Sequence, residues 1–165
     1  MEALWAPWRM EFIGGERPTG CIFCAFPAEE GSEADRKNLI LGRTRSSFVM
    51  LNKFPYNNGH VMVLPRRHTA AFGSIEAAEM ADLHALLQAS VRVLEQAYHP
   101  EGMNVGMNLG RSAGAGIADH LHYHVVPRWN GDTNFMPVFA ATKVMVEHLD
   151  ASYQKLRALF DVQLG

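Results

Sequence analysis

The sequence lacks the features that mark several specialised classes of protein. Its 165 residues contain only two cysteines, which excludes a disulfide-rich secreted scaffold. No apolar run approaches the roughly 18–20 residues that a helix needs to cross a bilayer, and we find no internal repeat. The first residues lack the basic and apolar regions of a secretory signal. These absences predict a cytoplasmic protein that does not associate with membranes.

The chain also lacks an excess of charge of either sign. Fifteen lysines and arginines nearly balance 17 aspartates and glutamates, which leaves a formal net charge of −2. Because no global positive field is available to hold a duplex, we do not expect nucleic acid as a partner. A local cluster of donors is enough for a small phosphorylated ligand, and such ligands stay open. The length suits one domain over residues 1–165 with a substantial core.

The pattern of apolar residues predicts an α+β fold. Residues 1–20 are rich in aromatic residues, proline and glycine and predict an irregular N-terminal arm, and the polar stretch 27–37 predicts a solvated loop. Short apolar runs between glycine, proline and asparagine predict five strands, over Asn38–Gly42, Ser47–Asn52, His60–Pro65, Asn104–Asn108 and His120–Pro127. Strands and helices do not alternate regularly, which argues against a parallel sheet.

Two helices are expected. The first runs from about Ile75 to Tyr98, with Ser74 as its cap and His84 on its solvent face. Its apolar stripe consists of Leu83, Leu87, Val91, Leu94 and Tyr98. The second runs from about Thr142 to Phe160 within a C-terminal helical segment, 141–165, and has on one side Leu149, Tyr153, Leu156 and Phe160.

The strongest chemical feature is the run His120-Leu-His-Tyr-His124. In a strand, residues at i, i+2 and i+4 share a face, so the three imidazoles are expected to point the same way. Packing alone explains such a cluster poorly, because each buried ring would need a hydrogen-bond partner. One interpretation is a metal site. The other is a histidine nucleophile with neighbours that orient it, which the glycine-rich link over 109–117 favours because its backbone can approach a phosphate.

Three motifs together resemble the histidine-triad (HIT) family. The stretch His120–Arg128 is similar to the family's pattern of three histidines that alternate with apolar residues. Asn52 followed by Gly59-His60 before a strand, and the element Asn108-Leu-Gly110, are similar as well. Two further stretches, at 4–9 and 127–135, resemble bacterial and archaeal members related to diadenosine tetraphosphate phosphorylases.

The resemblance implies a fold, a reaction and a set of site residues. Each protomer would hold a five-stranded antiparallel sheet, one long helix and a C-terminal helix, and two protomers would pair as a dimer. His122 would attack the α-phosphorus of a dinucleoside polyphosphate or a nucleoside phosphoramidate and form a nucleotidyl-histidine, with no catalytic metal. His124 and His60 would support it, and water or phosphate would then displace the nucleotide. The nucleotide would be bound by Asn52, Asn108, Gly114, Ile22, Phe23 and Phe26.

The sequence also resembles the zinc-containing subset of this family. The implied ligands of a structural Zn²⁺ are Cys21 and Cys24 of the C-x-x-C motif, His68 and His120. Two thiolates and two imidazoles suit a closed tetrahedral site. If His120 binds this ion, it cannot also belong to a catalytic metal site of three histidines.

One departure from the family pattern concerns the link before the triad. Many members carry a serine there whose hydroxyl contacts the phosphate or the leaving group, whereas this chain has Gly114-Ala-Gly-Ile117, with Gly116 in place of a hydroxyl and Ser112 nearby. The difference predicts less assistance to the leaving group. Two other functions stay open, namely a metalloenzyme built on His120, His122 and His124, and a nucleotide-binding protein without significant turnover.

Overall fold

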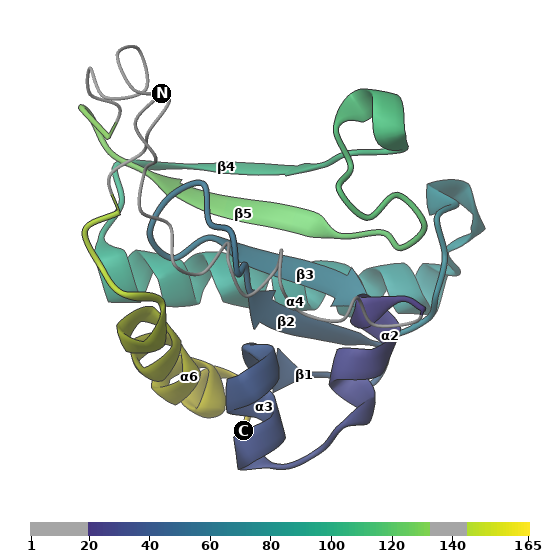
Figure 1. Ribbon diagram of the computed structural model, residues 1–165, viewed down its shortest axis with the longest axis horizontal. Coiled ribbons are helices and arrows are strands. Elements are labelled where there is room, and N and C mark those ends of the chain that lie inside the picture. The colour runs from purple at the N-terminus through teal and green to yellow at the C-terminus, as the bar shows by residue number, and fades with distance from the viewer. Residues whose placement is uncertain (1–19, 133–144) are drawn as a thin grey trace, which may run out of the picture.

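The computed structural model describes residues 20–132 and 145–165, which form one antiparallel sheet with helices packed against it (Figure 1). The strands have the order β1-β2-β3-β5-β4 across the sheet. They are β1 (Ile40–Arg43), β2 (Ser47–Leu51), β3 (Val61–Pro65), β4 (Gly102–Met107) and β5 (Tyr123–Arg128). The helices are α2 (Ile22–Ala25), α3 (Ser32–Asn38), α4 (Ala77–Tyr98) and α6 (Leu149–Leu164), with 3-10 turns η1 (Phe26–Ala28), η2 (Phe72–Ser74) and η3 (Arg111–Ala113). The predicted α+β class with five antiparallel strands is confirmed.

The central strands are buried on both faces, because every residue of β2 and β3 is buried. Alternate side chains such as Val49 and Val63 enter a core that α4 and α6 cover. The side chains between them, such as Phe48 and Met62, pack on the opposite face against Phe23 of α2. This double burial explains why both strands are continuous apolar runs in the sequence.

Two expected boundaries and one expected apolar stripe differ from the structure. Helix α4 begins at Ala77 after Glu76, and Ser74 lies in η2, where its hydroxyl donates to the carbonyl of Ala71. The predicted apolar stripe of α4 is only partly correct, because Leu83 and Leu94 are buried as expected but the rest of the buried side differs. The buried residues of α4 are Leu83, Leu86, Ala89, Ser90, Val93 and Leu94. Strand β5 begins at Tyr123 rather than at His120. His84 is exposed as expected, and its Nε2 lies 3.3 Å from the hydroxyl of Tyr123.

The stretch 27–37, expected to be a solvated loop, contains most of α3. The buried Asp35 of α3 forms ion pairs with Arg43 at 2.6 Å and with Arg157 of α6 at 2.9 Å. Burial alone would raise the pKa of Asp35, but hydrogen bonds from the two guanidinium groups hold that pKa below its usual range. The helix was missed because a charged network, rather than an apolar stripe, faces the protein.

The C-terminal helix is present as α6, but it begins at Leu149 rather than near Thr142, because the described residues 145–148 are not helical. Its inner side holds the expected Tyr153, Leu156 and Phe160. The N-terminal arm over 1–19, including the family-like stretch 4–9, lies outside the described residues, as do 133–144. In the described part of the chain, no helix is both long and apolar enough to cross a membrane.

Candidate active site

The three predicted catalytic histidines come together where β3 and β5 begin. His124 stands opposite Met62 in the pairing of β5 with β3, and His60 immediately precedes β3. The ring of His122 lies 4.9 Å from that of His124, and the ring of His60 lies 5.0 Å from it on the other side. His60 is fully buried and His122 is 4% exposed, so these two rings depend on protein partners for their hydrogen bonds, whereas His124 is half-buried.

A chain of hydrogen bonds fixes the tautomers of His60 and His124. The backbone N–H of Tyr56 can only donate, and it lies 3.0 Å from Nδ1 of His60, which must therefore accept. In the neutral ring the proton is then on Nε2, which donates to Nδ1 of His124 at 2.8 Å. The proton of neutral His124 must consequently lie on its Nε2. Burial, and then the nearby His122, lower the pKa of His124 to about 4, which keeps this ring neutral near pH 7.

His122 has the opposite tautomer. Its Nδ1 lies 2.9 Å from the backbone carbonyl oxygen of His120, which can only accept. The proton of His122 is therefore on Nδ1, and Nε2 keeps a lone pair. The ring of Phe23 packs 5.3 Å from the imidazole of His122 and restricts its rotation. Two histidines two residues apart thus offer a nucleophile and a hydrogen-bond donor.

A groove of about 410 Å³ opens beside His124 along β4 and β5. Tyr56 forms one wall and is 54% exposed, with its ring 4.6 Å from that of His60 and 5.7 Å from that of His124. The other lining residues are Asn104, Val105, Gly106, Met107, Asn108, Val126 and Arg128. Sequence reasoning missed Tyr56 and Asn104. Both stand in ordinary turn or strand positions, and no motif distinguishes them.

The six predicted nucleotide contacts fall into separate groups. Asn108 lines the groove, and its Nδ2 lies 3.7 Å from where a Cβ on Gly114 would stand, so these two meet beside the histidines. Asn52 holds a turn, because its Oδ1 accepts from the backbone N–H of Phe54 at 2.9 Å, while its Nδ2 lies 3.4 Å from the ring nitrogens of His60.

Ile22, Phe23 and Phe26 lie on α2 and η1, on the other side of His122 from the groove. Phe23 is only 3% exposed and contacts the rings of both His120 and His122. It therefore supports the histidines from within the core. Ile22 and Phe26 are half-buried against the same cluster and keep accessible surface for a ligand.

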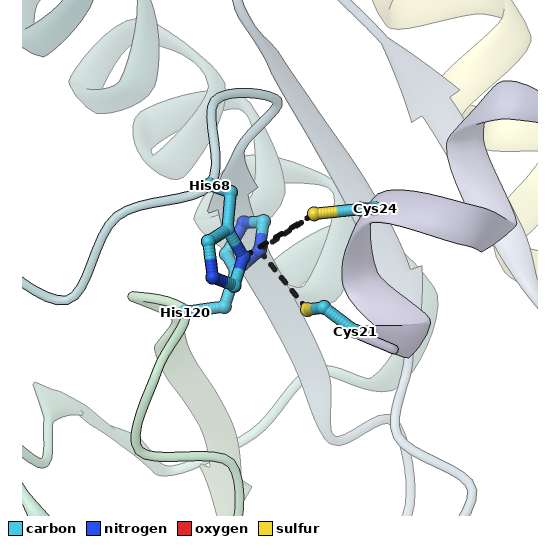
Figure 2. A group of neighbouring side chains, drawn as sticks. All are labelled: Cys21, Cys24, His68 and His120. Carbon is cyan, nitrogen blue, oxygen red and sulfur yellow. Dashed lines mark hydrogen bonds between the residues drawn. The ribbon is translucent and has the colours of Figure 1, made fainter. Parts of the chain in front are cut away.

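The four predicted metal ligands converge from three segments, as Figure 2 shows. Cys21 and Cys24 come from the start of α2, His68 from the loop after β3, and His120 from the segment before β5. Their donor atoms all lie within 4.8 Å of one another. Nδ1 of His120 lies 3.4 Å from Sγ of Cys21 and 3.6 Å from Sγ of Cys24. Nδ1 of His68 lies 3.3 Å from Sγ of Cys24.

These distances suit a tetrahedral ion. Ligands about 2.0–2.3 Å from a Zn²⁺ at the centre of a tetrahedron lie roughly 3.3–3.8 Å apart. Nε2 of His120 donates to the carbonyl oxygen of Pro65 at 2.9 Å, which leaves the lone pair on Nδ1 facing the sulfur atoms. The cluster can therefore hold a metal ion.

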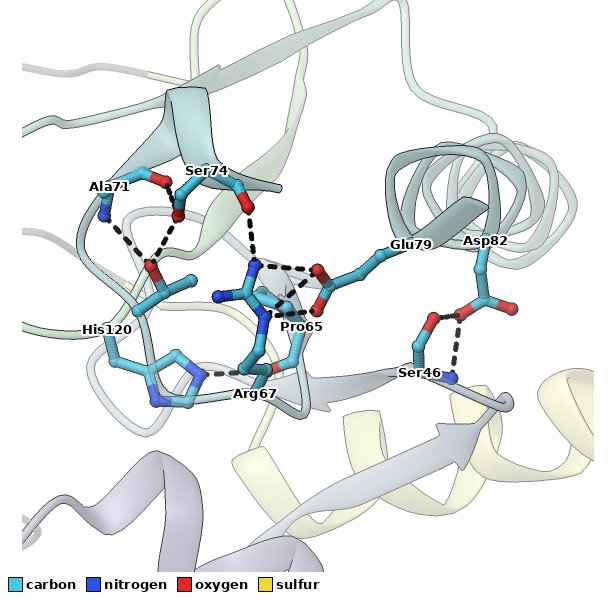
Figure 3. Close-up of polar contacts among 9 residues, drawn as sticks. Ser46, Pro65, Arg67, Ala71, Ser74, Glu79, Asp82 and His120 are labelled. Atoms are coloured by element: carbon cyan, nitrogen blue, oxygen red, sulfur yellow. Dashed lines mark hydrogen bonds and ion pairs between the residues drawn. The ribbon is translucent and has the colours of Figure 1, made fainter. Parts of the chain in front are cut away.

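The loop that carries His68 is fastened to α4 (Figure 3). Arg67 pairs with Glu79 at 2.9 Å and donates to the carbonyl oxygen of Ser74 at 3.0 Å. Farther along α4, the carboxylate of Asp82 accepts from the hydroxyl and the backbone N–H of Ser46. The two contacts of Arg67 hold the neighbouring His68 beside the start of α4.

Comparisons with known proteins agree with this geometry. The model of the HIT domain matches residues 33–131. The chain is 39% identical over 155 residues to an AP-4-A phosphorylase of Mycobacterium tuberculosis, which covers 90% of this chain and 79% of that protein. It is 32% identical over 110 residues to an adenosine 5'-monophosphoramidase of Schizosaccharomyces pombe, and the match covers 67% of this chain and 75% of that protein. A zinc-bound histidine triad protein of Mycobacterium smegmatis has a crystal structure with a TM-score of 0.65 at 25% identity, covering 86% and 94% of the two chains.

Proposed function

Because the chain belongs to the HIT family, we propose that it is a nucleotide hydrolase or transferase that cleaves its substrate at the α-phosphate. The observation that carries the proposal is the pair of opposite tautomers at His122 and His124. The substrate class is a dinucleoside polyphosphate or a nucleoside phosphoramidate. The names of the two relatives described above, a phosphorylase and a phosphoramidase, support these classes.

The reaction follows from the hydrogen bonds. Nε2 of His122 attacks the α-phosphorus, a P–N bond forms, and the bond to the leaving group breaks with its electron pair. The positive charge that develops on His122 is stabilised by the carbonyl oxygen of His120, which already accepts from Nδ1. Nε2–H of His124 donates to a phosphoryl oxygen. Water or phosphate then attacks the phosphorus, and the P–N bond breaks to restore the imidazole.

The two other functions are less well supported. A catalytic metal held by His120, His122 and His124 requires three converging donors, but Nδ1 of His120 faces Cys21 and Cys24, away from such a centre. Within the described residues, the Cys21 cluster is the one group of at least three metal-binding side chains. A binding protein without turnover retains the same contacts, so a measurement of product must separate it from an enzyme.

The test uses diadenosine tetraphosphate, with and without inorganic phosphate, and identifies the products by mass spectrometry. ADP with ATP formed only in the presence of phosphate indicates a phosphorylase, and AMP with ATP formed without phosphate indicates a hydrolase. The His122→Ala variant should lose either reaction, whereas His84→Ala, at an exposed histidine on α4, should keep it. Cleavage that persists in His122→Ala refutes the nucleophile assignment.

We further propose that the four-ligand cluster holds a structural Zn²⁺. The donor set and the distances between the donors support this ion. Cys21, Cys24, His68 and His120 would hold it in a closed site that joins α2 to the segment leading into β5. In this position the ion would stabilise the fold beside the nucleophile.

We also propose that residues 1–165 form a single domain that pairs as a homodimer. Strand β4 is the last strand of the sheet, and its Val105 is 47% exposed. Its outer edge has no paired strand among the described residues. Such an edge is a ready template for pairing with another chain. Light scattering at several protein concentrations measures the oligomeric state.

A further inference from the structure

The turn 54–59 between β2 and β3 carries the main-chain donor that fixes the tautomer of His60. The N–H of Tyr56 donates to Nδ1 of His60 at 3.0 Å, and the N–H of His60 donates to the carbonyl oxygen of Asn57 at 3.2 Å. These bonds close the turn on itself. A hydrogen bond weakens steeply when its donor is misaligned, so the bond to Nδ1 requires that the turn be held in a defined place beside the imidazole.

The side chain of Asn57 fastens this turn to the end of β5. Asn57 is 7% exposed, and its Nδ2 donates to the carbonyl oxygen of Pro127 at 3.0 Å and to Oδ2 of Asp132 at 2.8 Å. Both partners are acceptors, so both amide hydrogens of Asn57 are used. Because β5 also carries His124, one strand positions both the donor turn and the ring that His60 contacts.

Asp132 is held by groups that do not belong to the turn. Its side chain is 7% exposed. The carboxylate accepts from Nε of Arg128 at 2.6 Å, from Nη2 of the same guanidinium at 2.9 Å and from the backbone N–H of Trp129 at 3.2 Å. Nη1 of Arg128 donates to Oδ1 of Asn104 on β4 at 2.8 Å. The carboxylate is therefore anchored to β4 and β5, and its bond to Asn57 has the added strength of a hydrogen bond to an ionised oxygen.

We propose that Asp132 is a positioning residue that holds the turn in place through Asn57. The amide of Tyr56 then keeps its direction toward Nδ1 of His60. As a result the proton of His60 stays on Nε2, and the proton of His124 stays on its own Nε2, where it can reach a phosphoryl oxygen. Asp132 acts through these hydrogen bonds rather than on the substrate. The effect on the reaction rate rests on the proposed function, whereas the effect on the tautomers does not.

The tautomers can be measured by NMR of protein with isotopically labelled histidine, because protonated and unprotonated ring nitrogens have well-separated chemical shifts. Near neutral pH the wild type should show His60 and His124 each with its proton on Nε2. Asp132→Ala should give mixed tautomers at both rings. His122 should keep its proton on Nδ1 in this variant, because the carbonyl oxygen of His120 accepts it, and it therefore serves as an internal reference.

Two further variants separate the hydrogen bond from the charge. In Asp132→Asn an amide oxygen can still accept from Asn57, whereas the charge that pairs with Arg128 is lost, so we expect the wild-type tautomers. The matched control is Asp161→Ala, which breaks another i,i+4 pair, with Arg157, at an aspartate whose side chain is 57% exposed. It should leave tautomers and rate unchanged, because an exposed ion pair contributes little.

The reaction rate gives a second readout. For Asp132→Ala, kcat/KM with diadenosine tetraphosphate should fall by about ten-fold to a hundred-fold. The loss should lie mainly in kcat, because the proton of His124 acts where charge develops in the transition state. Asn57→Ala breaks the same connection from the other side, so the double variant should lose no more than Asn57→Ala alone. Asn57→Ala also carries the NMR test if Asp132→Ala does not fold.

Unchanged tautomers at His60 and His124 in Asp132→Ala would refute the proposal, whatever the rate. Mixed tautomers in Asp132→Asn would refute it as well, because the charge beside Arg128 rather than the hydrogen bond to Asn57 would then matter. If the wild type does not cleave the dinucleotide, the proposed function fails, but the tautomers of the variants still decide the role of Asp132.

Discussion

Replacing Gly59 with alanine tests how firmly the buried His60 is held. Gly59 has a φ of +73°, and a Cβ there would lie 2.6 Å from Cε2 of Tyr98 and 3.2 Å from Cδ2 of Leu94. The ring of Tyr98 cannot simply move aside, because its hydroxyl bonds to Glu147 at 2.6 Å and Lys155 lies 4.5 Å over its centre. The left-handed conformation costs alanine about 1–2 kcal/mol, and the overlap adds roughly 1–3 kcal/mol. We expect Gly59→Ala to lower the free energy of unfolding by about 2–5 kcal/mol.

The matched control is Gly131→Ala. Gly131 has a φ of +75°, but no atom of the described residues lies within 4 Å of its Cβ position, so this variant should measure the conformational cost of about 1–2 kcal/mol alone. Urea unfolding gives both free energies. The activity should separate the variants further, because Gly59 is adjacent to His60, and a displacement of about 1 Å at such a site can lower kcat/KM by about a hundred-fold.

A double variant isolates the contact. Removing the ring in Tyr98→Ala should relieve the overlap, so Gly59→Ala together with Tyr98→Ala should destabilise the protein by less than the sum of the two single changes. Equal stability losses for Gly59→Ala and Gly131→Ala, with activity intact in both, would refute the reasoning.

Three further predictions concern charge and metal. In the unfolded state His124 binds a proton below about pH 6.5, whereas in the folded state it resists protonation down to about pH 4. The stability that depends on this group is therefore complete above pH 6.5, and the free energy of unfolding declines by up to about 3 kcal/mol as the pH falls to 4. His124→Asn should flatten that part of a stability profile measured by urea unfolding. Chelation of the proposed zinc should lower the melting temperature before it affects the reaction rate measured at low temperature. Cys24→Ser should lower the melting temperature in the same way. A chelator that stops catalysis without changing the melting temperature contradicts a structural role. Asp35→Asn leaves Arg43 and Arg157 without their buried carboxylate and should cost about 3–5 kcal/mol in unfolding free energy, with a much smaller change refuting the importance of that network.

The sequence was most informative where one physical rule determines the outcome. Continuous apolar runs predicted β2 and β3 because both of their faces are buried. The C-x-x-C motif and two distant histidines predicted a cluster that can hold a metal ion, because zinc ligands follow narrow rules of type and spacing.

Features that depend on tertiary neighbours could not be predicted. Helix α3 faces the protein with Asp35, whose partners lie on β1 and α6. Tyr56 borders the groove because its turn brings its ring to 5.7 Å from that of His124 on β5. The alternation of the triad correctly placed His122 beside His124, with their rings 4.9 Å apart, even though β5 starts at Tyr123. It did not place His120 with them, because Nδ1 of His120 lies beside the sulfur atoms of Cys21 and Cys24.

The hydrogen bonds of the histidines also bear on how this site can change under mutation. Main-chain atoms determine the tautomers of His60, His120 and His122, through the amide of Tyr56 and the carbonyls of Pro65 and His120 itself. Chemically identical side chains thereby acquire the hydrogen-bonding patterns that suit the proposed ligand, nucleophile and donor. Main-chain groups persist through almost every substitution, so the division of roles tolerates extensive change in the surrounding side chains. One exception is proline at position 56, which would remove the backbone amide hydrogen that donates to Nδ1 of His60.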